Sequence, residues 1–104
     1  MPLFAAITED GPRWEEKKGI NEQRGWDEHY KFMSDSVRER FIILAGPLSN
    51  WPKVHALLIV DASNEKAART RLSEDPFIRS GVLKINELYS WELHYGRLLR
   101  DDSE

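Results

Sequence analysis

Cysteine is absent from this chain of 104 residues. Disulfide bonds, thiolate catalysis and metal sites built on cysteine are therefore excluded. Long apolar runs are absent as well, since none approaches the roughly 20 residues that cross a bilayer. The N-terminus lacks the basic start and the long apolar stretch of a secretory signal. We therefore expect a cytoplasmic protein that does not insert into a membrane.

Basic clusters and the familiar catalytic motifs are also missing. The net charge is −3 and both signs are mixed along the chain, so we expect no nucleic-acid partner. No glycine-rich phosphate loop and no Gly-x-Ser-x-Gly elbow occurs. The three histidines, His29, His55 and His94, show no metal-ligand spacing. We expect neither a metal ion nor an organic cofactor.

The composition that is present belongs to a folded domain. Hydrophobic residues make up 40% of the chain and charged residues 32%, a balance typical of globular proteins. The length fits one domain, which we place at residues 1–96, followed by a charged tail at 97–104.

Hydrophobic patterning predicts four strands and two main helices. The expected strands are 3–8, 41–45, 54–60 and 82–95, and the expected helices are 26–40 and 63–72, with a short helical turn from 75–76. A long polar connection, 9–25, precedes the first helix. The order βαββαβ predicts an α+β ferredoxin-like fold: a four-stranded antiparallel sheet with its helices on one face.

Several details of these elements are predicted by single residues. The first helix should bury an apolar stripe of Trp26, Tyr30, Met33 and Val37. Ser63 should cap the second helix, and Asp75 should cap the turn that begins at Pro76. The second strand should stop at Gly46-Pro47. In the last strand, Glu87 interrupts an otherwise apolar series of alternate positions.

The strands themselves predict a dimer. Residues 41–45 and 56–60 are apolar at every position, so both faces of the sheet should be dry. Two helices cover only one face. A second copy of the sheet, packed by two-fold symmetry, is the economical cover for the other.

Few residues are candidates for chemistry. His29 falls at the border of the helical stripe, where it either hydrogen bonds a backbone carbonyl or acts as a titrating group near neutral pH. Asp75 is explained by helix capping alone, and Gly46-Pro47 by a sharp exit from a strand. Trp14 and Trp51 belong to loops, where they either pack in the core or line a cleft.

Two segments resemble the YciI-like (YCII-related) family. One runs from His29 to the Ala-Gly-Pro-Leu turn at 45–48. The other spans 60–91 and holds a Ser-x-Glu-x-Ala helix start, then an Asp-Pro-Phe block followed by Gly-Val. The resemblance covers residues 3–8 and 26–95. The sequence departs from the family in the long 9–25 connection and in Trp51, both of which we expect at the mouth of a cleft.

The resemblance implies a dimeric α/β barrel whose cleft holds His29 beside Asp75 as the catalytic pair. Other residues that we expect to bind substrate are Gly46, Pro47, Trp51, Phe77 and Trp14. An aspartate can fix the tautomer of an imidazole, which then serves as a general acid or base. One related protein is a dehydrochlorinase of a chlorinated hydroxyhydroquinone, and muconolactone isomerase has a similar barrel in a neighbouring family.

Three hypotheses follow. The first is a cofactor-independent lyase or isomerase that moves protons on a small oxygenated cyclic substrate. The second is a non-catalytic homodimer that binds a small molecule or supports a partner protein. The third is a purely structural homodimer, which leaves the boundary histidine unexplained.

Overall fold

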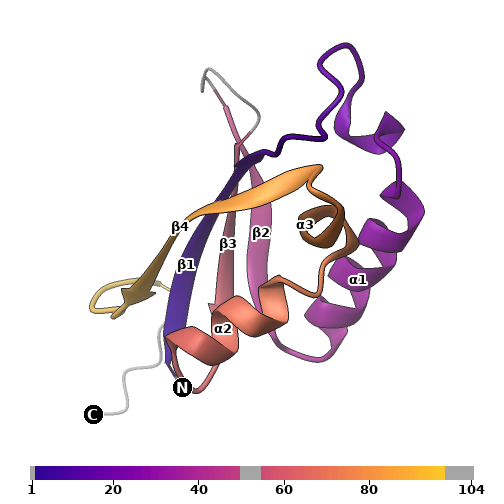
Figure 1. Ribbon diagram of the computed structural model, residues 1–104. Helices are drawn as coiled ribbons and strands as arrows, with labels where there is room; N and C mark the ends of the chain where they lie inside the picture. Colours follow the sequence, from indigo (N-terminus) through magenta and orange to yellow (C-terminus); the bar gives the residue numbers. More distant parts are fainter. Residues whose placement is uncertain (1, 50–54, 98–104) are drawn as a thin grey trace.

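The computed structural model describes residues 2–49 and 55–97. Its elements in chain order are β1 (Leu3–Asp10), the 3₁₀ turn η1 (Ile20–Glu22), α1 (Trp26–Arg38), β2 (Ile42–Leu48), β3 (His55–Asp61), α2 (Glu65–Leu72), α3 (Pro76–Ser80) and β4 (Leu83–Trp91). The strands form one antiparallel sheet in the order β2-β3-β1-β4, with the helices on one face (Figure 1). The predicted ferredoxin-like fold is confirmed.

The core lies between the sheet and the helices. Along β1, Phe4, Ala6 and Thr8 are buried, while the residues between them are only half-buried. Leu58 and Val60 on β3 pair with Ala6 and Phe4, so they face the same core. Burial therefore alternates along β1 although the sequence of this strand is almost uniformly apolar, because the helices cover only one of its two faces.

A β-bulge explains the odd position of Glu87. Ile7 pairs with Glu87, but Thr8 pairs with Ile85, so Asn86 is an extra residue on β4. An extra residue reverses the faces to which the following side chains point. Leu83 and Ile85 therefore face the core, whereas Glu87 and Tyr89 point to the opposite face of the sheet.

The prediction that the second strand stops at Gly46-Pro47 is wrong. β2 starts at Ile42 and continues through both residues to Leu48, with Pro47 paired to Ala56. Proline lacks an N–H donor, but β2 is an edge strand, where one side of the backbone needs no partner. A second bulge, at Ile43, sets which side chains of β2 face the helices.

The predicted stripe of α1 is partly wrong. Tyr30 and Val37 are 60% and 55% exposed, and the buried positions are His29 and Ser36. The helix is rotated so that a small serine approaches the sheet and the histidine reaches Asp75. Towards the end of α1, hydrogen bonds from Lys31 and Arg38 hold the pKa of the Asp35 carboxyl below its ordinary value.

Capping residues mark the starts of the two later helices, α2 and α3. Asn64, not Ser63, caps α2: its side chain accepts a hydrogen bond from the Ala67 N–H. The cap at Asp75 and the first-turn position of Pro76 are confirmed in α3, which ends at Gly81 with φ of 88°. β4 ends at Trp91, earlier than predicted.

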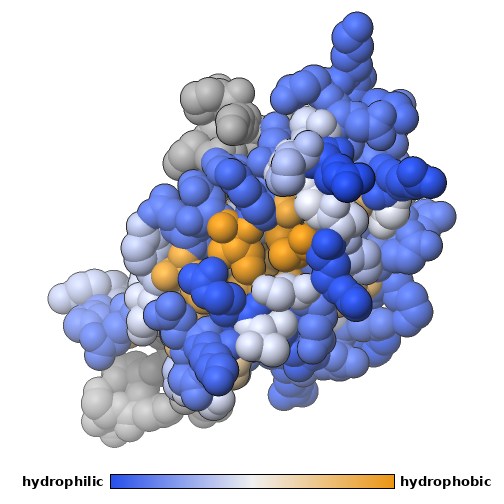
Figure 2. Space-filling view, viewed as in Figure 1, coloured by the Kyte–Doolittle hydropathy of each residue, from blue (hydrophilic) through white to orange (hydrophobic). Residues whose placement is uncertain are grey.

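The face of the molecule that carries the helices is largely hydrophilic, with an apolar patch at its centre (Figure 2). Large apolar side chains nevertheless remain exposed elsewhere in the described chain. Leu44, Tyr89 and Trp91, which the pairing places on the sheet face away from the helices, are 62%, 55% and 45% exposed. Several large exposed apolar side chains on one face of a sheet are typical of an interaction surface.

Candidate active site

His29 and Asp75 are brought together from positions 46 residues apart in the sequence. The imidazole Nδ1 of His29, on α1, lies 2.8 Å from Oδ1 and 3.0 Å from Oδ2 of Asp75. The two residues are 7% and 6% exposed. A carboxylate only accepts hydrogen bonds, so Nδ1 must be the donor of this contact.

Asp75 performs a second task at the same time. Its Oδ1 accepts a hydrogen bond of 2.9 Å from the Phe77 N–H, which caps α3. The capped turn holds the Phe77 ring against the imidazole, with the ring centroids 4.2 Å apart and the planes only 10° from parallel. The Asp-Pro-Phe sequence therefore supplies both the partner of Nδ1 and one stacking face for the ring.

A cavity of about 320 Å³ opens beside this pair, between α1 and the sheet. Its lining is mostly apolar and comprises Thr8, Ile20, Trp26, His29, Tyr30, Met33, Ala45, Gly46, Pro47, Ala56, Leu58, Asp75 and Leu83. The second imidazole nitrogen, Nε2, has no hydrogen-bond partner among the described residues, yet it is not sealed from solvent. Since His29 is almost fully buried, Nε2 is reachable only through the cavity.

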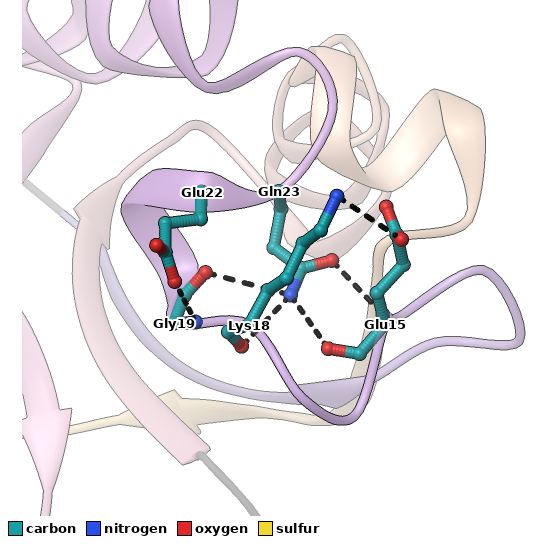
Figure 3. Close-up of polar contacts among 5 residues, drawn as sticks. All are labelled: Glu15, Lys18, Gly19, Glu22 and Gln23. Carbon is teal, nitrogen blue, oxygen red and sulfur yellow. Dashed lines mark hydrogen bonds and ion pairs between the residues drawn. The ribbon is translucent and has the colours of Figure 1, made fainter.

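The 9–25 connection forms an ordered support for one side of this cavity. Gln23, only 3% exposed, donates from Nε2 to the carbonyl oxygens of Glu15, Lys18 and Gly19, and its Oε1 accepts from the Glu15 N–H. Figure 3 shows these contacts converging on the one side chain. The turn that they close carries Ile20, which lines the cavity.

Only some of the residues expected to bind substrate line the cavity. Gly46 and Pro47 line the cavity. Phe77 is buried behind the imidazole rather than in the cavity wall. Trp14 packs with the cluster around Phe77, Val82 and Leu83. Trp51 lies outside the described residues.

Sequence reasoning missed two polar residues of the cavity wall. The apolar pattern predicts Thr8 only as the end of a strand, although its even spacing from Phe4 and Ala6 places it on the same face as the core. The predicted stripe buries Tyr30, which instead lies at the exposed edge of the cavity. Neither residue belongs to a motif, so only the three-dimensional arrangement assigns them to the site.

A second hollow lies on the opposite face of the sheet. Its volume is about 590 Å³, and the described residues of its wall, which include Leu44, Leu57, Ile59 and Trp91, carry no ionisable side chain. It is larger than the cavity beside His29, yet none of its described lining residues has a side chain that could transfer a proton. We therefore take it to be part of an interaction surface rather than a site of chemistry.

Among residues 2–49 and 55–97, no group of three or more histidine, aspartate or glutamate side chains gathers as metal ligands would. No helix in this part of the chain is both long enough and apolar enough to cross a membrane.

The sheet order and the one-sided helices define a ferredoxin-like α+β protein. A solved structure with this fold is 5-chloro-2-hydroxyhydroquinone dehydrochlorinase (TftG) from Burkholderia phenoliruptrix, in complex with 2,5-dihydroxybenzoquinone. The TM-score is 0.56 and the match covers 91% of this chain and 96% of that chain, with 16% sequence identity. At this identity the likeness concerns the fold. No protein-family model and no curated protein sequence matches the chain, so membership of the YciI-like family stays a prediction.

Proposed function

We propose that this protein is an enzyme that moves protons on a small oxygenated cyclic substrate, as a lyase or isomerase, without an organic cofactor. One observation supports the proposal: Nδ1 of His29 lies 2.8 Å from Oδ1 of Asp75, which favours the Nδ1–H tautomer, and the imidazole lines an apolar cavity. An imidazole in this tautomer has a free lone pair on Nε2 and can accept a proton from a bound ligand.

Each step of such a reaction can be assigned. Nε2 removes a proton from a hydroxyl group or an activated carbon of the ring. In a lyase the electron pair left behind expels a leaving group as its anion, and the imidazolium then releases its proton to water. In an isomerase the electron pair shifts a double bond, and the imidazolium returns the proton to another ring atom. Asp75 orients the imidazole and stabilises its charged form between the two proton transfers. The dehydrochlorinase that shares the fold acts on a chlorinated hydroxyhydroquinone, which is a substrate of this class.

The test is turnover by matched variants. Chloride release from chlorinated hydroxyhydroquinones and double-bond migration in unsaturated lactones should be measured for the wild type, His29→Gln and Glu28→Gln. Loss of the general base should reduce turnover about 10²- to 10⁴-fold, while the exposed neighbour Glu28 should leave it unchanged. Turnover that survives His29→Gln contradicts the proposal. Binding at the cavity with no turnover across the panel favours the non-catalytic binding module.

We also propose that two copies pair through the sheet face that the helices leave open. The exposed apolar side chains on that face and the 590 Å³ hollow between them support this arrangement. Burying such a surface is favourable because apolar area leaves water. The dimeric α/β barrel implied by the sequence resemblance would form in this way.

A further inference from the structure

Thr8 is a polar residue at a position where the fold otherwise buries apolar side chains. It follows Phe4 and Ala6 on the helix-facing side of β1 and is only 5% exposed. It also lines the cavity that contains His29. A valine would satisfy the strand and the core equally well at this position, so the hydroxyl needs a separate explanation.

The Thr8 hydroxyl has no hydrogen-bond partner among the described residues. Buried hydroxyl groups are normally hydrogen bonded, because an unpaired one loses its contacts with water. The Thr8 oxygen is nevertheless not among the described side-chain atoms that are fully buried without a hydrogen-bond partner, so part of it stays accessible. With so little of the residue exposed, the remaining access of the hydroxyl is through the cavity.

The bulge in β4 lies directly beside this residue. The pairing shifts between Ile7 and Thr8, where Asn86 is the extra residue. Bulges of this kind are common next to active sites, where they change the direction of a side chain. Here the bulge brings the apolar side chains of Leu83 and Ile85 onto the same face of the sheet as Thr8.

We propose that Thr8 determines substrate specificity by hydrogen bonding a second oxygen of an uncharged hydroxylated ring whose first oxygen meets Nε2 of His29. This inference rests on the proposed function, because it assumes that the cavity is the substrate site. A threonine hydroxyl both donates and accepts, so it can bind either a ring hydroxyl or a ring carbonyl.

The charge of the ligand follows from the rest of the wall. Among the described residues that line the cavity there is no lysine and no arginine. The one carboxylate, Asp75, already holds the imidazole and the α3 cap. An anionic ring would be desolvated in this apolar site without a counter-charge, which is unfavourable. An uncharged ring loses little by entering it.

The experiment measures binding rather than turnover. Phenol, catechol, resorcinol, hydroquinone and 4-hydroxybenzoate should be titrated into ¹⁵N-labelled wild type, Thr8→Val and Thr8→Ser, and Kd should be read from backbone amide shifts. In the wild type, at least one of the three dihydroxybenzenes should bind about tenfold more tightly than phenol, because one additional hydrogen bond typically increases affinity by about that factor. Thr8→Val should abolish this preference, and Thr8→Ser should retain it. 4-Hydroxybenzoate should bind more weakly than hydroquinone.

The unfolding midpoint of Thr8→Val gives an independent readout. If the hydroxyl serves only the ligand, the midpoint should stay equal or rise, whereas a structural role would lower it. A preference for dihydroxybenzenes that persists in Thr8→Val would overturn the assignment, as would tighter binding of the carboxylate. The proposed function fails differently, through unaltered turnover in His29→Gln, so the two failures are distinguishable.

Discussion

His29 is constrained on two sides by a single short stretch of chain. Asp75 holds Nδ1 through its carboxylate, and Phe77 stacks on the imidazole plane. Both contacts originate in the capped turn that begins α3, so the orientation of the ring depends on that cap. The remaining ring nitrogen has no hydrogen-bond partner among the described residues, and the imidazole lines the cavity.

Replacing Asp75 should separate its two tasks. Asp75→Ala removes the cap and leaves the buried Nδ1–H without an acceptor, so it should lower the free energy of unfolding by about 2 to 4 kcal/mol. Asp75→Asn keeps an oxygen that can cap Phe77 and should cost less than half as much. Urea unfolding monitored by tryptophan fluorescence measures both. Equal losses in the two variants would show that the cap contributes nothing.

At the scale of single residues, the sequence predicted the His29–Asp75 pair but not the other polar residues of the cavity wall. The family resemblance predicts that His29 and Asp75 lie together, and the structure places their side chains in contact. The sequence did not indicate a functional role for Thr8, because a threonine at the end of a strand has many ordinary explanations. Its role depends on which face of β1 meets α1, and only the tertiary packing determines that.

The connection between β1 and α1 depends on Gln23. Its amide makes four hydrogen bonds with the loop backbone, and its burial shields them from water. Gln23→Ala should lower the free energy of unfolding by about 2 to 4 kcal/mol, since several backbone groups lose their partners. Amide hydrogen exchange should accelerate over residues 15–23. The exposed neighbour Asn21, replaced by alanine, is the control, and comparable acceleration in both would argue against a specific role for Gln23.

Gly11 and Gly46 should differ in how well they tolerate replacement by alanine. A Cβ at Gly11 would lie 2.2 Å from the carbonyl oxygen of Gly81, where the two backbone segments are hydrogen bonded. A Cβ at Gly46 would meet nothing within 4 Å. Gly11→Ala should therefore destabilise the fold by about 1 to 3 kcal/mol, while Gly46→Ala should change it by less than about 0.5 kcal/mol. Thermal unfolding of the two variants checks this difference, and equal midpoints would contradict it.

The elements were predictable where local chemistry decides them. Asp75-Pro76 and Gly81 mark the ends of α3 because capping and a positive φ are local requirements. The extension of β2 through Gly46-Pro47 was not predictable, because proline is tolerated there only on an edge strand. The rotation of α1 was also missed, because hydrophobic periodicity alone does not register a buried histidine–aspartate contact.

The whole molecule leaves an apolar sheet face uncovered, and this face bears on assembly. At micromolar concentration we expect sedimentation velocity to give twice the mass of one chain. Leu44→Lys should shift the protein to the monomer, because a charge would be buried without a partner. Val37→Lys, at a similarly exposed position on α1, should leave the dimer intact. A wild type that sediments as a monomer contradicts the proposed pairing.

The sequence pattern predicted the order of helices and strands along the chain, because apolar spacing distinguishes the two kinds of element. From that order the ferredoxin-like plan predicted an antiparallel sheet with its helices on one face. The uniformly apolar strands also indicated that the open face needs a cover. The two bulges did not follow from the pattern, since each depends on the register between strands. They matter because they decide which side chains of β2 and β4 face the cavity.

The tautomer of His29 tests the central claim most directly, because proton transfer at the cavity requires an Nδ1–H donated to Asp75 and an unprotonated Nε2. Two-dimensional ¹⁵N–¹H spectra of the imidazole groups, with the ring neutral, report which nitrogen carries the proton. We predict the Nδ1–H form for His29 in the wild type and its loss in Asp75→Ala. A wild-type His29 in the Nε2–H form would contradict the account.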